Sequence, residues 1–151
     1  VEAVASALDA PTVFAQALPV LDRPLSAPVR PGAPDPANAK SVADWIEEGV
    51  RLTLQGQASA LVTAPIAKAP LYAAGFRFPG HTEFIAELTA DAAHGGVRGP
   101  VMMLSAADLR VCLVTIHTPL SEVPQLVTAE RVMRTARVAH EALWRDFGIA
   151  S

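Results

Sequence analysis

Gly80, His81, Thr82 and Glu83 follow one another at a point where a loop is expected to become a helix. The free backbone N–H groups and the dipole at the start of a helix favour an anion, above all a phosphate. The hydroxyl of Thr82 could donate to such a ligand, and the imidazole of His81 could bind or polarise an oxyanion. The alternative is an ordinary helix start, in which Thr82 caps the helix beside an exposed His81.

A second histidine, His117, stands in the run VTIHTPL, directly after the β-rich residues 110–116. If those residues form a strand, His117 lies just past its C-terminal end, which is where open α/β sheets bind ligands. A neutral imidazole at that edge can coordinate a divalent metal. A catalytic metal normally takes three protein ligands, so one histidine is weak support, and a hydrogen bond to the loop backbone is the alternative.

Lys68 is a weaker candidate, because it could face a phosphate or carboxylate but is equally consistent with a solvated helix residue. The other residues of interest are assigned to the surface or to packing. They are His94 and His140 on the surface, Cys112 in an apolar strand, and Trp45 and Trp144 in packing. The single cysteine excludes a disulfide framework and the Cys-x-x-Cys of a zinc deaminase. No G-x-G-x-x-G, P-loop or G-x-S-x-G motif is present.

The elements that would position these residues alternate between helices and strands. Residues 1–21 indicate a short helical piece and an apolar run, and residues 22–37 a Pro-rich connection with five of the 13 prolines. Helices are expected over 41–55, opened by a capping box at Ser41, and over 66–74, 82–90 and 129–147. Strands are expected over 58–63, 101–105 and 110–116, the last two as a hairpin with a four-residue loop. This mixture predicts an α/β layered fold.

The helix over 129–147 carries an apolar stripe that should face a core. Its residues are Val132, Met133, Ala136, Ala139, Leu143 and Phe147.

The composition describes a folded, mildly acidic chain of 151 residues with a net charge of −3. A hydrophobic content of 51% argues against disorder, and the acidity argues against nucleic acid as the main partner. The sequence contains no membrane-spanning run and no signal peptide, so a cytoplasmic protein is expected. A complete domain of this length would bury about 68–70% of its unfolded surface. The first residue, Val1, and the end just after a helix-stop glycine would fit a fragment of a longer protein.

Three runs together resemble the 4-hydroxythreonine-4-phosphate dehydrogenases, NAD-dependent enzymes of pyridoxal phosphate biosynthesis. They are LVTAPIAKAPLYAAGFRFPGHTEFIAEL, VMMLSAADLRVCLVTIHTPLSEVPQLVT and the helix ending FGIA. The resemblance runs from about Ser41 to Ala150, and one departure is Ala64, where many members have glycine.

The resemblance implies an α/β fold of the isocitrate/isopropylmalate dehydrogenase type, a mixed sheet with flanking helices that is present here only in part. It implies that His81 and Thr82 contact substrate and that His117 is a ligand of a divalent metal, zinc, magnesium or cobalt. It also implies a homodimer, with NAD or NADP as cofactor. Because the family's other metal-binding histidines and most of its NAD site are absent, residues 1–151 are expected to be the central fragment of a two-domain dehydrogenase, inactive alone.

The reaction that the resemblance implies is oxidation of 4-phosphooxy-L-threonine to a β-keto acid, which decarboxylates to 3-amino-2-oxopropyl phosphate. A paralogous dehydrogenase acting on D-erythronate or D-threonate 4-phosphate is the nearest alternative, because its substrates share the same phosphate-alcohol-carboxylate plan. A non-catalytic remnant that binds a ligand or partner is the other alternative.

Overall fold

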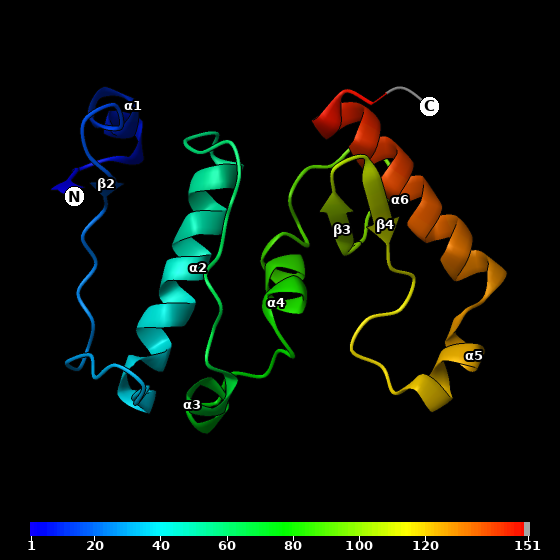
Figure 1. Cartoon of the computed structure of the whole chain (residues 1–151), viewed down its shortest axis with the longest axis horizontal. Helices are drawn as coiled ribbons and strands as arrows, with labels where there is room; N and C mark the ends of the chain where they lie inside the picture. The colour runs from blue at the N-terminus through cyan, green and yellow to red at the C-terminus, as the bar shows by residue number, and fades with distance from the viewer. Residues whose placement is uncertain (150–151) are drawn as a thin grey trace.

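The N-terminal elements are short and lie together at one end of an elongated molecule (Figure 1). The structure, a computed structural model, describes residues 1–149. β1 (Glu2–Ala3) pairs in parallel with β2 (Pro19–Val20), and a 3₁₀ turn (Ala7–Asp9) and α1 (Ala10–Val13) connect them. The expected helical piece within residues 1–21 is therefore confirmed.

The Pro-rich residues 22–37 contain no helix or strand until a 3₁₀ turn begins at Pro36. Two polar contacts hold them against the next helix. The Arg23 guanidinium donates from Nε and Nη2 to the two carboxylate oxygens of Glu48, at 2.9 and 2.7 Å. The Asn38 side chain accepts from the backbone N–H of Ala27 at 2.8 Å and donates to its carbonyl at 3.0 Å. These contacts place the connection alongside α2.

α2 (Ala39–Leu54) buries Ala39, Ile46 and Val50 on one face. It begins two residues before the expected start at Ser41, because the 3₁₀ turn capped by the Asp35 side chain runs directly into it. The predicted capping box at Ser41 is therefore wrong: Asn38 is the N-cap, and Ser41 is already helical. The Asp44 carboxylate accepts from Lys40 Nζ instead.

Residues 58–63, expected as a strand, form none within the described residues. They run as an extended trace from the end of α2 down to α3 (Lys68–Ala73), beside α2 (Figure 1). A Cβ atom on Gly49 of α2 would lie 2.7 Å from Leu61 Cδ1, so the glycine allows this close approach. A strand requires a hydrogen-bonded neighbour, and no segment between residues 1 and 149 lies where it could supply one.

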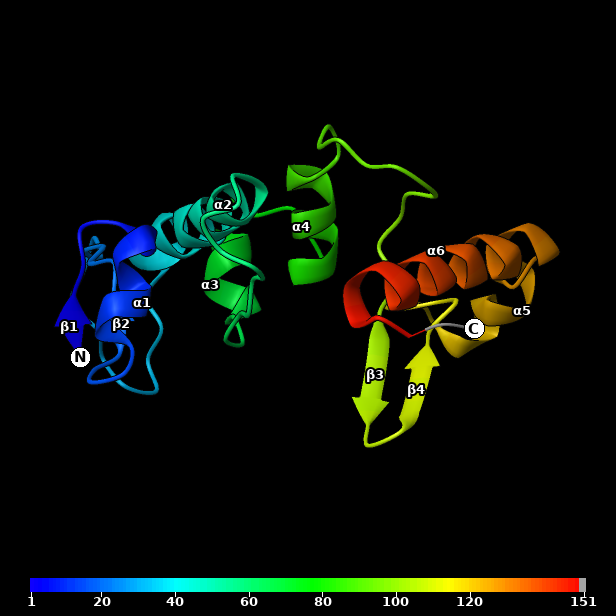
Figure 2. The same cartoon turned by 90° about the horizontal axis from the view of Figure 1, so that it is seen from above.

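α4 (His81–Leu88) stands between the two ends of the molecule in both views (Figures 1 and 2). Its Phe84 is buried and meets Phe76 and Phe78, each at a ring-centroid distance of 5.0 Å. Phe76 and Phe78 also contact each other edge-on at 5.4 Å. This aromatic cluster fixes the loop before α4 against the helix itself.

The C-terminal elements are a hairpin and a long helix. β3 (Met103–Ala106) and β4 (Leu109–Cys112) pair antiparallel around Ala107–Asp108, so the turn has two residues rather than the expected four. The second strand ends at Cys112 instead of Ile116. At the next pair the Leu113 N–H still donates to the Met102 carbonyl at 2.9 Å, but within residues 1–149 no hydrogen bond returns from the Met102 N–H to Leu113, so the ladder stops there. A 3₁₀ turn (Leu120–Glu122) and α5 (Val123–Leu126) lead to α6.

α6 (Ala129–Phe147) has the predicted bounds. The Thr128 hydroxyl accepts from the Arg131 N–H at its start, and Gly148 ends it in a left-handed conformation (φ 64°). No residue of α6 is buried, however, and Met133 and Phe147 of the expected inward stripe are 53% and 55% exposed. The hairpin is the sheet against which α6 lies in Figure 2, so most of the stripe has nothing to pack against in residues 1–149.

The whole structure exposes far more surface than a closed domain does. Its accessible area is 10799 Å², against about 7,300 Å² for a compact protein of 15.8 kDa. About 53% of the unfolded surface is buried, rather than the 68–70% of a complete domain. The α/β mixture is confirmed, but each sheet in the described residues has two strands. No helix in residues 1–149 is long and apolar enough to cross a membrane.

Candidate functional site

Gly80, His81, Thr82 and Glu83, the first candidates from the sequence, lie at the start of α4. Gly80 is the N-cap and His81 the first helical residue, so Thr82 sits inside the first turn and does not cap the helix as the alternative reading proposed. The Thr82 hydroxyl forms no hydrogen bond with residues 1–149. It therefore has both a free donor and a free acceptor for a ligand.

Two buried polar atoms flank Thr82. His81 Nε2 and Glu83 Oε2 are both shielded from solvent and have no hydrogen-bond partner within the described residues. An unpaired buried polar atom costs about 1–3 kcal/mol, so native proteins rarely leave one unsatisfied. A ligand or further protein atoms at the start of α4 would remove this cost.

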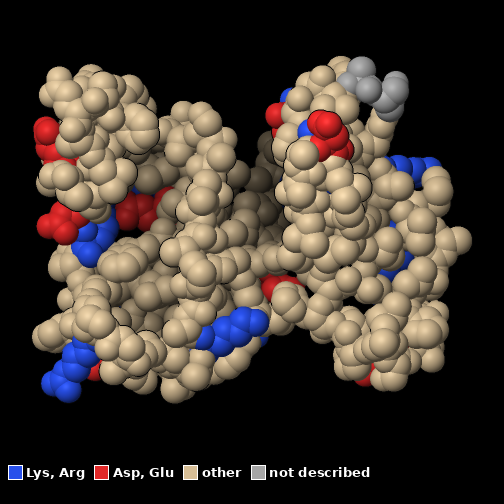
Figure 3. Space-filling model, in the orientation of Figure 1, with Lys and Arg blue, Asp and Glu red and all other residues tan. Residues whose placement is uncertain are grey.

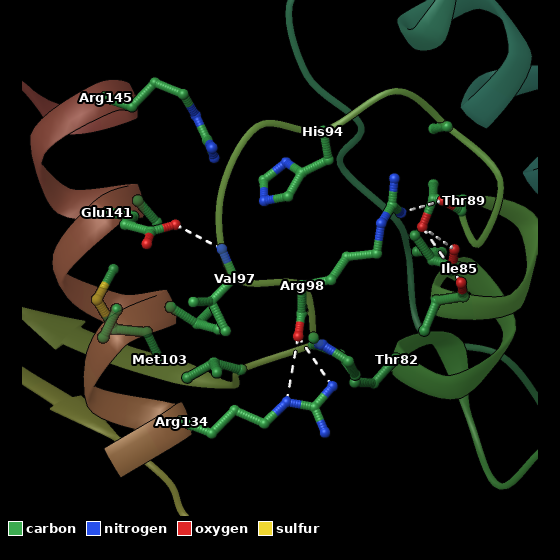
Figure 4. Close-up of a pocket in the computed structure, with 18 of the residues that line it drawn as sticks. Thr82, Ile85, Thr89, His94, Val97, Arg98, Met103, Arg134, Glu141 and Arg145 are labelled. Atoms are coloured by element: carbon green, nitrogen blue, oxygen red, sulfur yellow. Dashed lines mark hydrogen bonds between the residues drawn. The ribbon is translucent and has the colours of Figure 1, made fainter.

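A cavity of about 900 Å³ opens beside α4, between residues 91–101 and α6 (Figure 4). The space-filling view shows a deep hollow between the two ends of the molecule (Figure 3). Thr82 lines the cavity, whereas His81, Lys68 and His117 do not. Its other labelled lining residues are Ile85, Thr89, His94, Val97, Arg98, Met103, Arg134, Glu141 and Arg145.

A chain of polar contacts holds the residues before β3 between α4 and α6 (Figure 4). Arg134 of α6 donates from Nε and Nη2 to the carbonyl of Arg98, at 3.2 and 2.9 Å. Arg98 Nη1 in turn donates to the carbonyl of Thr89 at the end of α4, at 2.7 Å. The Glu141 carboxylate accepts from the Val97 N–H at 2.8 Å. The helix that carries Thr82 is thus tied to α6 through its far end.

Sequence reasoning missed these tying residues. The available signal was the spacing of Arg134 and Glu141, which lie two helical turns apart and so share one face of α6 beside the apolar stripe. A charged pair on the edge of a core-facing stripe is suited to hold a neighbouring loop. The sequence could not indicate which loop it was.

His117 is exposed and lies in the segment between β4 and the turn before α5. Its backbone is left-handed, with φ at 54°. Histidine tolerates this region better than most residues do, yet such a conformation costs energy and persists only where the surroundings require it. No group of three metal-ligating side chains gathers within residues 1–149. The described residues therefore do not give His117 the two further ligands that a catalytic metal site normally needs.

The secondary candidates lie mostly where solvent reaches them. Lys68 is the exposed first residue of α3, and His94 and His140 are exposed as predicted. Cys112 is half-buried beside the cavity. Trp45 lines a smaller cavity, but Trp144 is 67% exposed, so its assignment to packing is wrong for the described residues.

The comparison with protein families settles which group of proteins this is. The family model described as pyridoxal phosphate biosynthetic protein PdxA matches residues 1–151. The chain belongs to the PdxA family. The resemblance drawn from the GHTEF and TIHTPL runs is thereby confirmed, and the family is one of dehydrogenases.

PdxA relatives are longer than this chain. The 4-hydroxythreonine-4-phosphate dehydrogenase of Caulobacter vibrioides is 57% identical over 150 residues, which cover 99% of this chain and 45% of that protein. The enzyme of the same name from Maricaulis maris is 60% identical over 135 residues, covering 88% and 40%. The crystal structure of the Klebsiella pneumoniae enzyme superposes with a TM-score of 0.77 at 30% identity, covering 95% of this chain and 43% of that one. The chain spans less than half the length of these relatives.

Proposed function

We propose that this chain is the central part of a PdxA dehydrogenase that oxidises 4-phosphooxy-L-threonine, with NAD or NADP as hydride acceptor. The product is a β-keto acid that decarboxylates to 3-amino-2-oxopropyl phosphate, in vitamin B6 biosynthesis. The observation that carries the proposal is the family match, which runs without interruption over residues 1–151. By itself the chain is expected to be inactive, because it spans less than half of the named dehydrogenases.

His81 and Thr82 are proposed to bind the substrate. The support is local: Thr82 has a free hydroxyl at the cavity, and His81 Nε2 is buried without a partner. Both lie in the first turn of α4, where the helix dipole favours a negatively charged group. A phosphorylated substrate held there would satisfy the polar atoms and keep its alcohol in a fixed orientation.

His117 is proposed as one ligand of a divalent metal, zinc, magnesium or cobalt. The residues described here do not form a metal site on their own, since a catalytic metal normally takes about three protein ligands and no group of three gathers within residues 1–149. The strained backbone of His117 supports a role beyond solvent exposure. Its companion ligands would come from other parts of the complete enzyme or from a second subunit.

The complete protein is proposed to be a cytoplasmic homodimer with the two-domain fold of the isocitrate/isopropylmalate dehydrogenases, and residues 22–37 to be a connection within it. The uncovered stripe of α6 supports a larger fold, because a helix with one apolar face is stable only when that face is packed. The Arg23 and Asn38 contacts support an ordered connection rather than a flexible linker.

The test uses a chimera, defined as the Caulobacter vibrioides enzyme in which these 151 residues replace the matching segment. NADH formation would be followed with 4-phosphooxy-L-threonine and with 4-phospho-D-erythronate, each with and without a chelator. Turnover of the threonine compound that the chelator abolishes would support the proposal. Preference for the erythronate would assign the chain to the paralogous group, and silence with both, while the intact Caulobacter enzyme turns over, would contradict the dehydrogenase proposal.

A further inference from the structure

Arg77 is an exposed cation in the loop between α3 and α4, shortly before the N-cap residue Gly80. The residues on either side of it, Phe76 and Phe78, both pack against Phe84 of α4 at a ring-centroid distance of 5.0 Å. Within residues 1–149 the Arg77 guanidinium forms no ion pair and no side-chain hydrogen bond. The aromatic cluster therefore holds the backbone that carries this positive charge beside the start of the helix.

The loop is too short to carry that charge far from the proposed substrate site. An extended chain spans at most about 3.6 Å per residue, so the Cα atoms of Arg77 and Gly80 lie within roughly 11 Å of each other. The Tyr72 hydroxyl of α3 also donates to the Pro79 carbonyl at 3.4 Å, which ties the end of the loop to α3. In dilute salt the Debye length is about 30 Å, so the charge acts on a ligand at the first turn of α4.

The other charges of the chain disfavour a phosphorylated substrate. The net charge is −3, and α4 carries Glu83 in its first turn and Glu87 in its second. A phosphate ester brings about −1.5 to −2 near pH 7, so 4-phosphooxy-L-threonine, with one carboxylate and one ammonium group, has a net charge of about −2. Arg77 is the basic residue nearest to α4 along the chain, and a cation there offsets the repulsion and raises the local concentration of the anion.

We propose that Arg77 guides the phosphorylated substrate to His81 and Thr82 by long-range electrostatic attraction, without bonding to it. The inference rests on the proposed function in one respect, namely that a phosphorylated anion binds at the first turn of α4. It goes further in assigning part of the affinity for that anion to a residue outside the binding turn. Because the attraction depends on charge and not on hydrogen-bond geometry, lysine should replace arginine, and added salt should remove the effect.

Binding of 4-phosphooxy-L-threonine to the chimera, measured by isothermal titration calorimetry without NAD, tests the proposal. At an ionic strength of about 0.01 M, Arg77→Gln should raise the dissociation constant about threefold, as expected for one charge about 10 Å from a dianion in water. At about 1 M the Debye length is about 3 Å, and the variant and the unsubstituted chimera should agree within about 1.3-fold. A change below about 1.5-fold in dilute salt, or a change of equal size in both salts, would overturn the proposal.

Two further variants separate the charge from the structure. Arg77→Lys keeps the charge but loses the planar fork, so its dissociation constant should stay within about 1.5-fold of the unsubstituted chimera. Arg30→Gln removes an exposed charge from residues 22–37, which lie on the side of α2 away from α4 (Figures 1 and 2), and should change the constant less than about 1.3-fold. If Arg77→Lys loses as much affinity as Arg77→Gln, or Arg30→Gln does, the guiding role of Arg77 is wrong.

The binding measurement separates this inference from the proposed function. If the substrate binds with the expected dependence on Arg77 and on salt but no NADH forms, the guiding role stands and the dehydrogenase activity is contradicted. If NADH forms but the dissociation constant does not depend on Arg77, the reverse holds. If the folded chimera does not bind the substrate, both proposals are overturned.

Discussion

The left-handed backbone of His117 gives a prediction about stability that does not depend on any ligand. A residue with a Cβ atom at φ 54° costs about 1 kcal/mol more than glycine in that conformation. We expect His117→Gly to be about 1 kcal/mol more stable than His117→Ala, measured by urea unfolding of the 151-residue chain. Equal stability of the two variants would show that the segment relaxes out of this conformation in solution.

If His81 and Thr82 bind the substrate, replacing either residue in the chimera should selectively lower its catalytic activity. Removing a hydrogen bond to a charged group typically costs about 1.5–3 kcal/mol, or about 10- to 100-fold. His81→Ala and Thr82→Ala should therefore lower kcat/KM for 4-phosphooxy-L-threonine by about 10- to 100-fold, measured by NADH formation. His140→Ala, an exposed histidine on α6, is the matched control and should change kcat/KM less than twofold. Losses of the same size in all three variants would contradict the assignment.

The contact between Arg23 and Glu48 makes part of the stability depend on pH. The hydrogen bond from Arg23 lowers the pKa of Glu48 below its ordinary value, against an opposing effect of burial. A carboxyl whose folded pKa is lowered stabilises the fold above its unfolded pKa, near about 4.3, and loses that contribution as the pH falls through the folded value. At pH 7 the Glu48→Gln variant should thus unfold at a lower urea concentration than the unsubstituted chain. The difference between the two unfolding midpoints should narrow below about pH 4. If the difference between the two midpoints does not vary with pH, the ion pair between Arg23 and Glu48 is not formed in solution.

At the scale of elements, the stability of α6 depends on the caps at its two ends, because other elements cover little of its surface. The Thr128 hydroxyl satisfies the Arg131 N–H at 3.2 Å. Thr128→Ala should cost about 0.5–2 kcal/mol of stability, measured by urea unfolding, whereas Thr128→Ser keeps the hydroxyl and should cost much less. If Thr128→Ala is neutral, the first turn of α6 is already frayed in the isolated chain.

The helices were predictable from the sequence and the strands less so, for one physical reason. A helix such as α6 is determined by signals next to it in the chain, here Thr128 before and Gly148 after it. A strand depends on a distant partner. The segment over 58–63 has the right composition but no backbone hydrogen-bond partner in residues 1–149, and the second hairpin strand ends where Met102 returns no hydrogen bond to Leu113.

In the candidate site too, the residues with a local sequence signal were predictable, and those that depend on contacts between distant segments were not. His81 and Thr82 were found because a glycine, a histidine and a threonine before an apolar helix form a local pattern. Arg98, Arg134 and Glu141 were missed because their contacts join segments 36 and 44 residues apart. The metal-binding proposal for His117 remains a prediction from family resemblance, since no group of three metal-ligating side chains gathers in the described residues.

At the scale of the whole molecule, the large exposed area predicts unusual unfolding behaviour. The denaturant dependence of the unfolding free energy, the m-value, grows with the surface that unfolding exposes. Because the folded chain already exposes 10799 Å², its urea m-value should be about one fifth smaller than that of a closed domain of equal length. An m-value typical of a closed domain would mean that the two ends of the molecule close on each other, or on a second copy, in solution. Unfolding at several protein concentrations would distinguish these two cases.

The free backbone of residues 58–66, which forms no hydrogen bond with the backbone of residues 1–149, has a consequence during synthesis. A ribosome adds about 5–20 residues per second, so residue 66 is joined to the chain roughly 4–17 s before residue 151. For the part of that time in which it is outside the ribosome, the segment can pair with the same segment on a neighbouring nascent chain. Pro65 limits this hazard, because it interrupts the row of N–H donors and so disfavours long, regular pairing between copies. The proline that ends the predicted strand thus also serves as a safeguard while the protein is still being made.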